Sequence, residues 1–231
     1  MAERPQDKRV LSIATPLGEN VVLLDAISGR EDLGRLFRYE LELVSNEAAI
    51  DTDKILGENV TVRLQLAQDE ERYINGYVAR FGSAGLKRGL RSYSATIVPW
   101  TWFLTRTSDC RIYQNTSVPD VIKDVFDRHG FADYKLRLNE TYRVWEYLAQ
   151  YRETGFNFVS RLMEQEGIYY YFTHENGKHT MVLADAPASH DAMEGDPIPF
   201  YPPQEAESAR GPHLSHWQVE REVLPGAVSL A

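Results

Sequence analysis

The sequence contains almost no cysteine, since Cys110 is the single one among 231 residues. One thiol cannot form a disulfide within the chain, which is typical of synthesis in a reducing compartment. No run approaches the roughly 18 apolar residues of a membrane helix, and the charged start, residues 1–9, lacks the apolar stretch of a secretory signal. Clustered lysines and arginines are also missing and the net charge is −9. We therefore expect no binding to nucleic acid or membranes.

Reactive side-chain constellations are scarce as well. Cys110 could be a nucleophile with His129 as its base, but no local signature joins them, and a small, partly buried thiol is the favoured interpretation. Two histidine pairs lack an evident third zinc ligand, and histidines beside a hairpin turn are expected to be solvated. These pairs are His174/His179 and His213/His216.

Four acidic residues follow one another in a Pro-rich stretch, namely Asp185, Asp191, Glu194 and Asp196. The two carboxylates of a glycosidase come from rigid positions on opposite sides of a cleft, so acids on one loop favour a solvated surface. We predict no catalytic, cofactor-binding or metal-binding residue in this chain.

The first half of the chain alternates apolar and polar residues in several short segments. In 36–44, for example, Phe37, Tyr39 and Leu41 share one face. Strands are predicted at 10–15, 21–27, 36–44, 60–66, 73–81 and 90–98, with a short helical piece at 53–57, a bulge or tight bend at Gly76 and a loop at 82–89. Turns every ten residues or so predict a small antiparallel β-barrel over 10–98, after a disordered N-terminus at 1–9.

Helical periodicity appears after residue 98. Pro99 suits the first turn of a short helix, and Ser117 is a candidate N-cap for a helix with an apolar stripe from Val118 to Phe126. Thr154 is a candidate N-cap for a second helix that ends at Gly167. An aromatic strand at 168–173, a type I′ turn at Asn176-Gly177 and a returning strand at 179–185 follow. Residues 99–185 are therefore predicted to be an α+β domain inserted after the barrel.

The aromatic strand admits two interpretations. Tyr169 and Tyr171 face one way and Tyr170 and Phe172 the other, so one face could bind a sugar while the other packs in the core. Core packing is favoured. Residues 186–215 are predicted to be an irregular loop and 216–231 the truncated start of a second β-barrel. The fold class is α+β, mainly β.

Several short motifs together resemble the VgrG family, the valine-glycine repeat tip proteins of bacterial type VI secretion, which are similar to the baseplate hubs of contractile phages. The resemblance runs from about residue 10 to 231. Its residues, expected to have structural roles, are Pro99, Trp100, Arg111, Gln114, Gln150, Tyr151, Glu153, Arg161, Leu162, Glu164, Gly167 and Tyr169. Gly155 departs from the Glu-Ser-Asp common around positions 153–155, so the helix capping could differ.

The resemblance implies a non-enzymatic hub. Three copies would form a ring that joins the hexameric Hcp tube to a spike, with baseplate components, a PAAR tip and effectors as further partners. Such a protein would be assembled in the cytoplasm and delivered outward by type VI secretion. A hub of a phage tail or tailocin is the alternative, and a cell-wall hydrolase or a carbohydrate-binding module is a more distant one. The resemblance identifies no tube-contact residues.

Overall fold

The computed structural model describes residues 6, 9–66, 70–192, 198–202, 213, 214, 216–221 and 223. The chain divides into two compact units, Met1–His190 and Asp191–Ala231. The predicted disorder at 1–9 falls largely outside the described residues. Among the described residues, no helix is long and apolar enough to cross a membrane.

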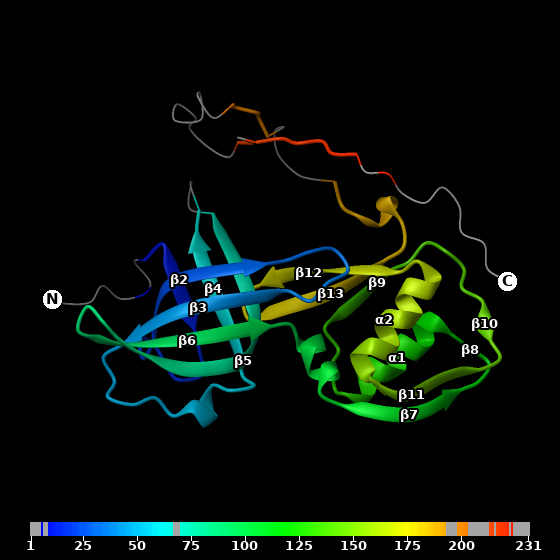
Figure 1. The fold of residues 1–231 in the computed structure, drawn as a ribbon, viewed down its shortest axis with the longest axis horizontal. Helices are drawn as coiled ribbons and strands as arrows, with labels where there is room; N and C mark the ends of the chain where they lie inside the picture. The colour runs from blue at the N-terminus through cyan, green and yellow to red at the C-terminus, as the bar shows by residue number, and fades with distance from the viewer. Residues whose placement is uncertain are drawn as a thin grey trace. The chain divides into compact units, whose positions relative to one another are not determined.

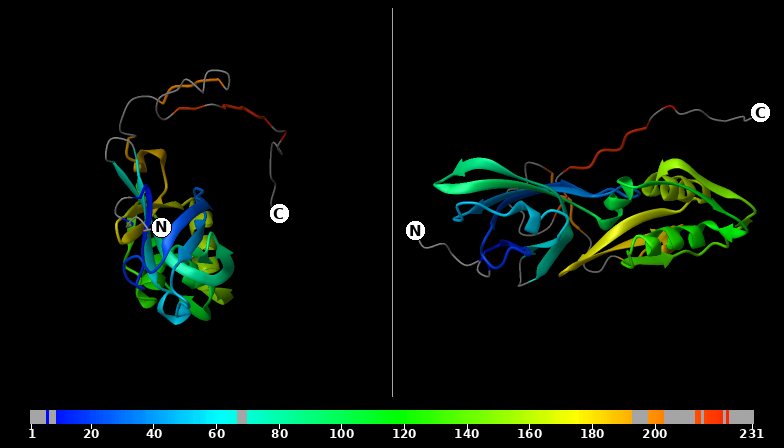
Figure 2. Two further views of the ribbon diagram at one scale, coloured as in Figure 1. Left: turned by 90° about the vertical axis from the view of Figure 1, so that its left-hand side faces the viewer. Right: turned by 90° about the horizontal axis from the view of Figure 1, so that it is seen from below.

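A curled antiparallel sheet forms the first half of the larger unit (Figures 1 and 2). Alternating apolar residues bury one face of each strand, as the pattern predicts. The hydrogen-bonded order is β1-β4-β5-β6-β3-β2. The strands are β1 (Leu11–Ala14), β2 (Leu23–Arg30), β3 (Arg38–Ser45), β4 (Asn59–Gln65), β5 (Glu71–Lys87) and β6 (Leu90–Val98), with a 3-10 turn, η2 (Thr52–Lys54). The predicted mainly-β architecture is confirmed, as a curled half-barrel rather than a closed barrel.

Two local predictions in this sheet are wrong. The supposed loop at 82–89 is strand, because β5 continues against β6 to the pair Lys87↔Leu90 and turns at Arg88 and Gly89, which have φ +54° and +85°. Gly76 pairs regularly with Val60, and the register shifts lie further along β5. A Cβ at Gly76 would lie 3.0 Å from the Val98 carbonyl oxygen, so glycine there permits close packing instead of a bulge.

The side chain of Gln6 bridges the two outer strands of the curled sheet. Its Oε1 accepts from the backbone N–H of Ile13 on β1 at 2.7 Å, and its Nε2 donates to the carbonyl of Val22, just before β2, at 3.1 Å. The described parts of β1 and β2 form no ladder with each other. The amide therefore supplies hydrogen bonds where the sheet does not close.

We expect Gln6→Ala to cost about 1–2 kcal/mol, because it leaves two backbone groups without their partner. Amide hydrogen exchange should become faster at Ile13 and stay unchanged at Val62, in the middle of the sheet. Equal protection of Ile13 in both proteins would show that the bridge contributes nothing.

The second half of the larger unit packs two helices against short strands (Figure 1). Pro99 caps a 3-10 helix rather than lying in its first turn. The helices are η4 (Trp100–Thr105), α1 (Val118–Arg128), α2 (Gly155–Glu166) and η5 (Pro187–Ser189). The strands are β7 (Ser108–Tyr113), β8 (Thr116–Ser117), β9 (Tyr134–Arg137), β10 (Val144–Trp145), β11 (Leu148–Thr154), β12 (Tyr169–Glu175) and β13 (Lys178–Ala184). Strand β13 lies between β12, antiparallel, and β9, parallel.

The helix boundaries follow their predicted caps. The Ser117 hydroxyl accepts from the N–H of Asp120, and the Thr154 hydroxyl accepts from that of Asn157. Gly167 ends α2 with φ +72°. The β12–β13 turn differs from the prediction, because Gly177 has positive φ and Asn176 does not, which excludes type I′.

Each half of the larger unit has its own hydrophobic core. The core of the sheet includes Phe37, Leu41 and Ile97, and the core of the α+β half includes Phe126 and Leu162. Both halves nevertheless fall within the same compact unit. The β12–β13 hairpin runs from the helices to the sheet and joins them (Figure 1).

In the smaller unit, the described residues contain an isolated bridge between Phe200 and Leu214. The strand predicted at 216–223 is not formed over 216–221. A strand needs a partner for its backbone hydrogen bonds, and none pairs with this segment among the described residues. The start of a second barrel here stays a prediction.

Candidate functional site

A network of buried polar side chains lies where the β12–β13 hairpin meets the curled sheet. Its centre is Asn75 on β5, whose exposed fraction is 0%. The Asn75 amide nitrogen lies 2.7 Å from Oδ1 of Asn59, 2.8 Å from the Thr61 hydroxyl and 3.2 Å from the Val60 carbonyl, all on β4. Its Oδ1 lies 2.7 Å from Nδ1 of His179 on β13. One amide therefore ties the sheet to the hairpin.

His179 continues the network into the α+β half. Its Nε2 accepts from the backbone N–H of Trp100 at 2.9 Å, so the ring proton lies on Nδ1 and is donated to Asn75. Burial, followed by the nearby His174 ring, lowers the pKa of His179 to about 3, against a weaker effect of Asp133. The ring is therefore neutral at pH 7 with both nitrogens bonded.

His174, the cross-strand partner of His179, extends the network to the β2–β3 connection. Its Nδ1 lies 3.1 Å from the backbone nitrogen of Asn75, and its Nε2 lies 2.8 Å from Oε1 of Glu31. The same carboxylate oxygen accepts from the Tyr39 hydroxyl at 2.7 Å. Burial alone would raise the pKa of Glu31, but the hydrogen bonds from His174 and Tyr39 outweigh it and lower this pKa.

Aromatic rings enclose the two histidines. The Phe37 ring centroid lies 4.9 Å from that of His174 and 5.4 Å from that of His179. Phe172 packs edge-on against Phe37 at 5.0 Å, and Tyr77 packs against His179 at 5.9 Å. Rings on several sides strengthen each buried hydrogen bond by excluding water.

The network connects four segments that are distant in sequence: the β2–β3 connection, β4–β5, η4 and the β12–β13 hairpin. Its polar atoms bond to one another and to the backbone. Glu31 lies at the exposed edge of the network, whereas a change at the Asn75, Trp100 or His179 contacts leaves a buried group unsatisfied. This arrangement fixes the two cores to each other, and we name it the junction network: Glu31, Asn75, His174 and His179. Its chemistry is structural.

The junction network corrects the expectation that His174 and His179 are solvated. His179 is 2% exposed and the side chain of His174 is 9% exposed. The alternation of β12 could have predicted that His174 is buried, because His174 lies on the same face as Tyr170 and Phe172. The docking that buries this end of the face depends on a sheet about a hundred residues away in sequence, which local patterns do not describe.

We expect acid to destabilise the larger unit through His179. The unfolded histidine titrates near 6.5 and the folded one near 3, so between these values the unfolded state binds the extra proton. The contribution of His179 to the unfolding free energy is therefore fully present above pH 6.5. It decreases as the pH falls below this value, by about 1.4 kcal/mol per pH unit at most. Urea unfolding between pH 7.5 and 5 should show a loss of about 2 kcal/mol from this group.

A comparison of two variants isolates this effect. His179→Gln should reduce the pH dependence of the unfolding free energy by about one proton, whereas Asn157→Ala, which replaces an exposed side chain without a titratable group, should leave the dependence unchanged. Parallel profiles for wild type and His179→Gln would rule out a neutral, buried His179.

The proposed nucleophile and base are not joined by a hydrogen bond in the described structure. Cys110 is exposed on β7, against the expectation of a partly buried thiol, and lies across the ladder from Tyr151. His129 caps α1, with Nδ1 2.8 Å from the Val125 carbonyl and Nε2 3.2 Å from the Thr107 hydroxyl. Its ring nitrogens are therefore both used locally.

Asp185 organises a loop at the surface of the molecule. Its carboxylate accepts from the backbone N–H of Asn139 at 2.8 Å, from that of Glu140 at 2.9 Å and from the Tyr142 hydroxyl at 2.9 Å. Glu194 and Asp196 lie outside the described residues. Among the residues that are described, no three His, Cys, Asp or Glu side chains gather as a metal site would require.

The aromatic strand packs as its alternation predicts. Tyr170 is 4% exposed and belongs to the core of the α+β half. On the opposite face, the His190 ring stacks on Tyr169 at 5.7 Å and on Tyr171 at 5.0 Å. This ring covers part of the face that the sugar-platform alternative requires.

The motif residues are spread over the α+β half rather than gathered in one site. Trp100 and Leu162 are core residues, and Arg161 pairs with Glu153 at 2.6 Å. Elsewhere, Arg111 pairs with Asp109, Gln150 donates to the Glu153 carbonyl, and Tyr169 donates to the Ala186 carbonyl, while Tyr151, Gln114 and Glu164 are exposed.

A family model described as phage tail baseplate hub (GPD) matches residues 30–231. Among curated proteins, the type VI secretion system spike proteins VgrG1c and VgrG1a of Pseudomonas aeruginosa are 48% and 47% identical over 97% and 96% of this chain. The chain spans about a third of their length, 31% and 34%. These matches relate the chain to one part of longer proteins.

Two solved structures share the fold. An E. coli protein described as a type VI secretion component, similar to T4 tail proteins gp27 and gp5, aligns with TM-score 0.72 at 23% identity, over 84% of this chain and 53% of that one. A tail protein of Neisseria meningitidis aligns with TM-score 0.57 at 15% identity, over 86% and 57%. The chain thus shares its fold with a type VI secretion component and with a bacterial tail protein.

Proposed function

Because this chain belongs to the phage tail baseplate hub family and is related to type VI secretion spike proteins, we propose that it is the hub part of such a spike. Three copies form a ring, one side of which binds the end of a hexameric Hcp tube. The ring joins the tube to the spike and to its PAAR tip, and it transmits the outward force that delivers effectors. The 46–48% identity to three spike proteins over nearly the whole chain carries this proposal.

The junction network supports a mechanical function. A part that is pushed from behind must keep its two cores in fixed positions, and a fully bonded buried network gives one arrangement rather than several. The family is structural, and we propose that this chain has no enzymatic activity. It would assemble in the cytoplasm, contact baseplate components, and leave the cell with the spike.

A hub of a phage tail or tailocin is the second candidate, since the matching family model is that of a phage tail baseplate hub and a tail protein of Neisseria meningitidis shares the fold. That likeness is at 15% identity, whereas the likeness to the secretion spikes is far higher. Neighbouring genes for a membrane complex would favour the secretion spike, and capsid or tail-only genes would favour the alternative.

A genetic experiment tests the proposal. In a strain that lacks its own spike gene, the full-length gene should restore Hcp release into the medium, and an internal deletion of residues 10–190 should not. A deletion of residues 203–212 in the same gene serves as the control for protein level. Full Hcp release with the 10–190 deletion would refute the hub function.

Residues 1–231 are expected to associate weakly by themselves, because much of the stability of the proposed trimer would come from the spike. Light scattering on residues 1–231 should report mostly monomer. A stable trimer at micromolar concentration would contradict this expectation.

A further inference from the structure

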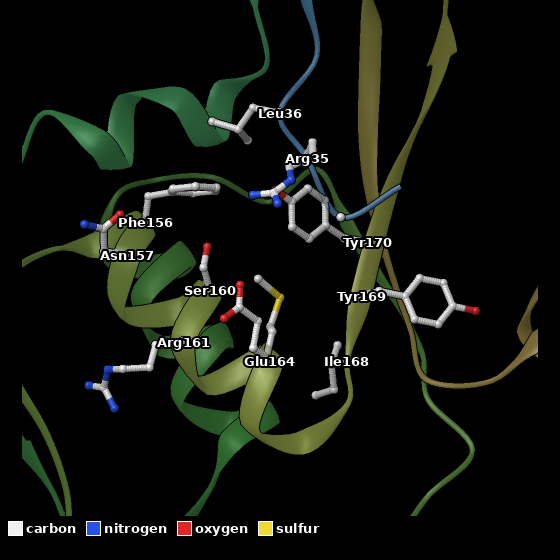
Figure 3. Close-up of a pocket in the computed structure, with 12 residues that line it drawn as sticks. Arg35, Leu36, Phe156, Asn157, Ser160, Arg161, Glu164, Ile168, Tyr169 and Tyr170 are labelled. Carbon is white, nitrogen blue, oxygen red and sulfur yellow. The ribbon is translucent and has the colours of Figure 1, made fainter. Parts of the chain in front are cut away.

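A hollow of about 400 Å³ opens between α2, β12 and the β2–β3 connection (Figure 3). Part of its wall is apolar, from Leu36, Phe156, Met163, Ile168 and Tyr170, and part is polar, from Arg35, Asn157, Ser160, Arg161 and Glu164. In Figure 3 the side chains of Leu36, Phe156, Ile168 and Tyr170 surround an open centre, and Tyr169 points away from it. We name this hollow the α2 pocket. It lies outside the junction network and no function described above uses it.

Three polar side chains at the α2 pocket have no partner among the described residues. The Ser160 hydroxyl is buried without a hydrogen bond. The guanidinium of Arg35 and the carboxylate of Glu164 make no hydrogen bond or ion pair within the described structure, and both extend toward the open centre (Figure 3). An apolar pocket with unpaired charges on its rim suits an inserted apolar side chain that has a charged neighbour.

The same chain displays such an element at the tip of the β5–β6 hairpin, which lies at the end of the sheet opposite the helices (Figure 2). Leu86 is 75% exposed, and Arg88, two residues on, is also exposed. Lys87 anchors the tip by ion pairs with Asp25 at 2.6 Å and Glu42 at 2.7 Å. Alternation along β5 then holds Leu86 away from those partners.

We propose that the α2 pocket receives the β5–β6 tip of a second copy, with Leu86 inserted among the apolar walls and Arg88 paired with Glu164. This inference rests on the proposed threefold hub. A ring of three requires two different, complementary surfaces on each copy. The chain offers a pocket with an unpaired acid and a fixed, protruding leucine beside a base. Burying both apolar surfaces removes the exposed leucine and fills the hollow.

Disulfide trapping in the full-length protein tests the contact directly. In a background with Cys110→Ser and any other cysteine replaced, one tagged chain carries Leu86→Cys and another carries Asn157→Cys, an exposed position on the pocket rim. Oxidation should link the two chains to each other. A chain that carries both cysteines should give linked species that stop at three if the ring closes. As a matched control, Leu56→Cys, on a partly exposed leucine of another turn, should not link to Asn157→Cys.

Charge exchange tests the pairing. Arg88→Glu or Glu164→Arg alone should reduce the yield of the 86–157 link by about tenfold, and the two together should restore it. If the protein is trimeric but neither the link nor the restoration occurs, the contact is refuted and the hub function stands. If the full-length protein is not trimeric, the proposed function itself fails.

Discussion

Asn75→Ala should destabilise the larger unit by about 3–4 kcal/mol, because several buried groups lose their partner at once. The groups are the amide of Asn59, the Thr61 hydroxyl, the Val60 carbonyl and Nδ1 of His179. Thr61, Val60 and His179 have little access to water, since they are 5%, 1% and 2% exposed. Urea unfolding at pH 7.5, followed by circular dichroism, measures the change.

Asn157→Ala is the matched control for this prediction. Asn157 is exposed near the start of α2, and its side chain makes no hydrogen bond in the described structure, so we expect a change within about 0.5 kcal/mol. If Asn75→Ala also costs less than about 1 kcal/mol, the junction network does not hold the two cores together.

Trp100→Ala should cost about 3–5 kcal/mol, the usual range for removing a large buried aromatic side chain. The Trp100 ring stacks on Phe131 at 4.7 Å and packs edge-on against Phe126 at 4.9 Å. Its indole N–H donates to the Asp133 carbonyl at 3.2 Å, while its backbone N–H is the donor to His179. The substitution therefore leaves a cavity beside the junction network and removes one of the two donors to the Asp133 carbonyl, which still accepts from the backbone N–H of Met181.

Two further variants define how Trp100 acts. Trp100→Phe should recover part of the loss, because it refills the cavity without the indole N–H. Trp102→Ala serves as the control, since Trp102 is only partly buried and its ring lies under the Arg106 guanidinium. We expect this substitution to lower the unfolding free energy by about 1 kcal/mol. Equal losses of unfolding free energy for Trp100→Ala and Trp102→Ala would contradict the assignment of Trp100 to the core.

The helix boundaries were predictable from the sequence because the groups that begin and end each helix lie within a few residues of one another. Ser117 and Thr154 cap helices with their own hydroxyls, and Gly167 adopts the left-handed conformation that ends α2. The departure at Gly155 does not disturb the cap. The irregular backbone lies earlier, in β11, where Arg152 has φ +51° at a register shift.

Features that depend on distant partners were not predictable in the same way. Residues 82–87 look like a loop because Gly82 and Gly85 are poor strand formers, yet they are strand because β6 lies beside them. Asn75 and His179 are polar residues at positions that only the docked hairpin buries. The motif resemblance identified the family but not the junction network, although Trp100 donates its backbone N–H to His179.

We propose that this chain is a rigid hub that caps a tube as a threefold ring. Electron microscopy of the full-length protein mixed with Hcp tubes tests this proposal. We predict trimers docked on tube ends, with the two cores of each copy in one fixed arrangement after particle averaging. Full-length protein that stays monomeric, or that never occupies a tube end, would refute the hub function.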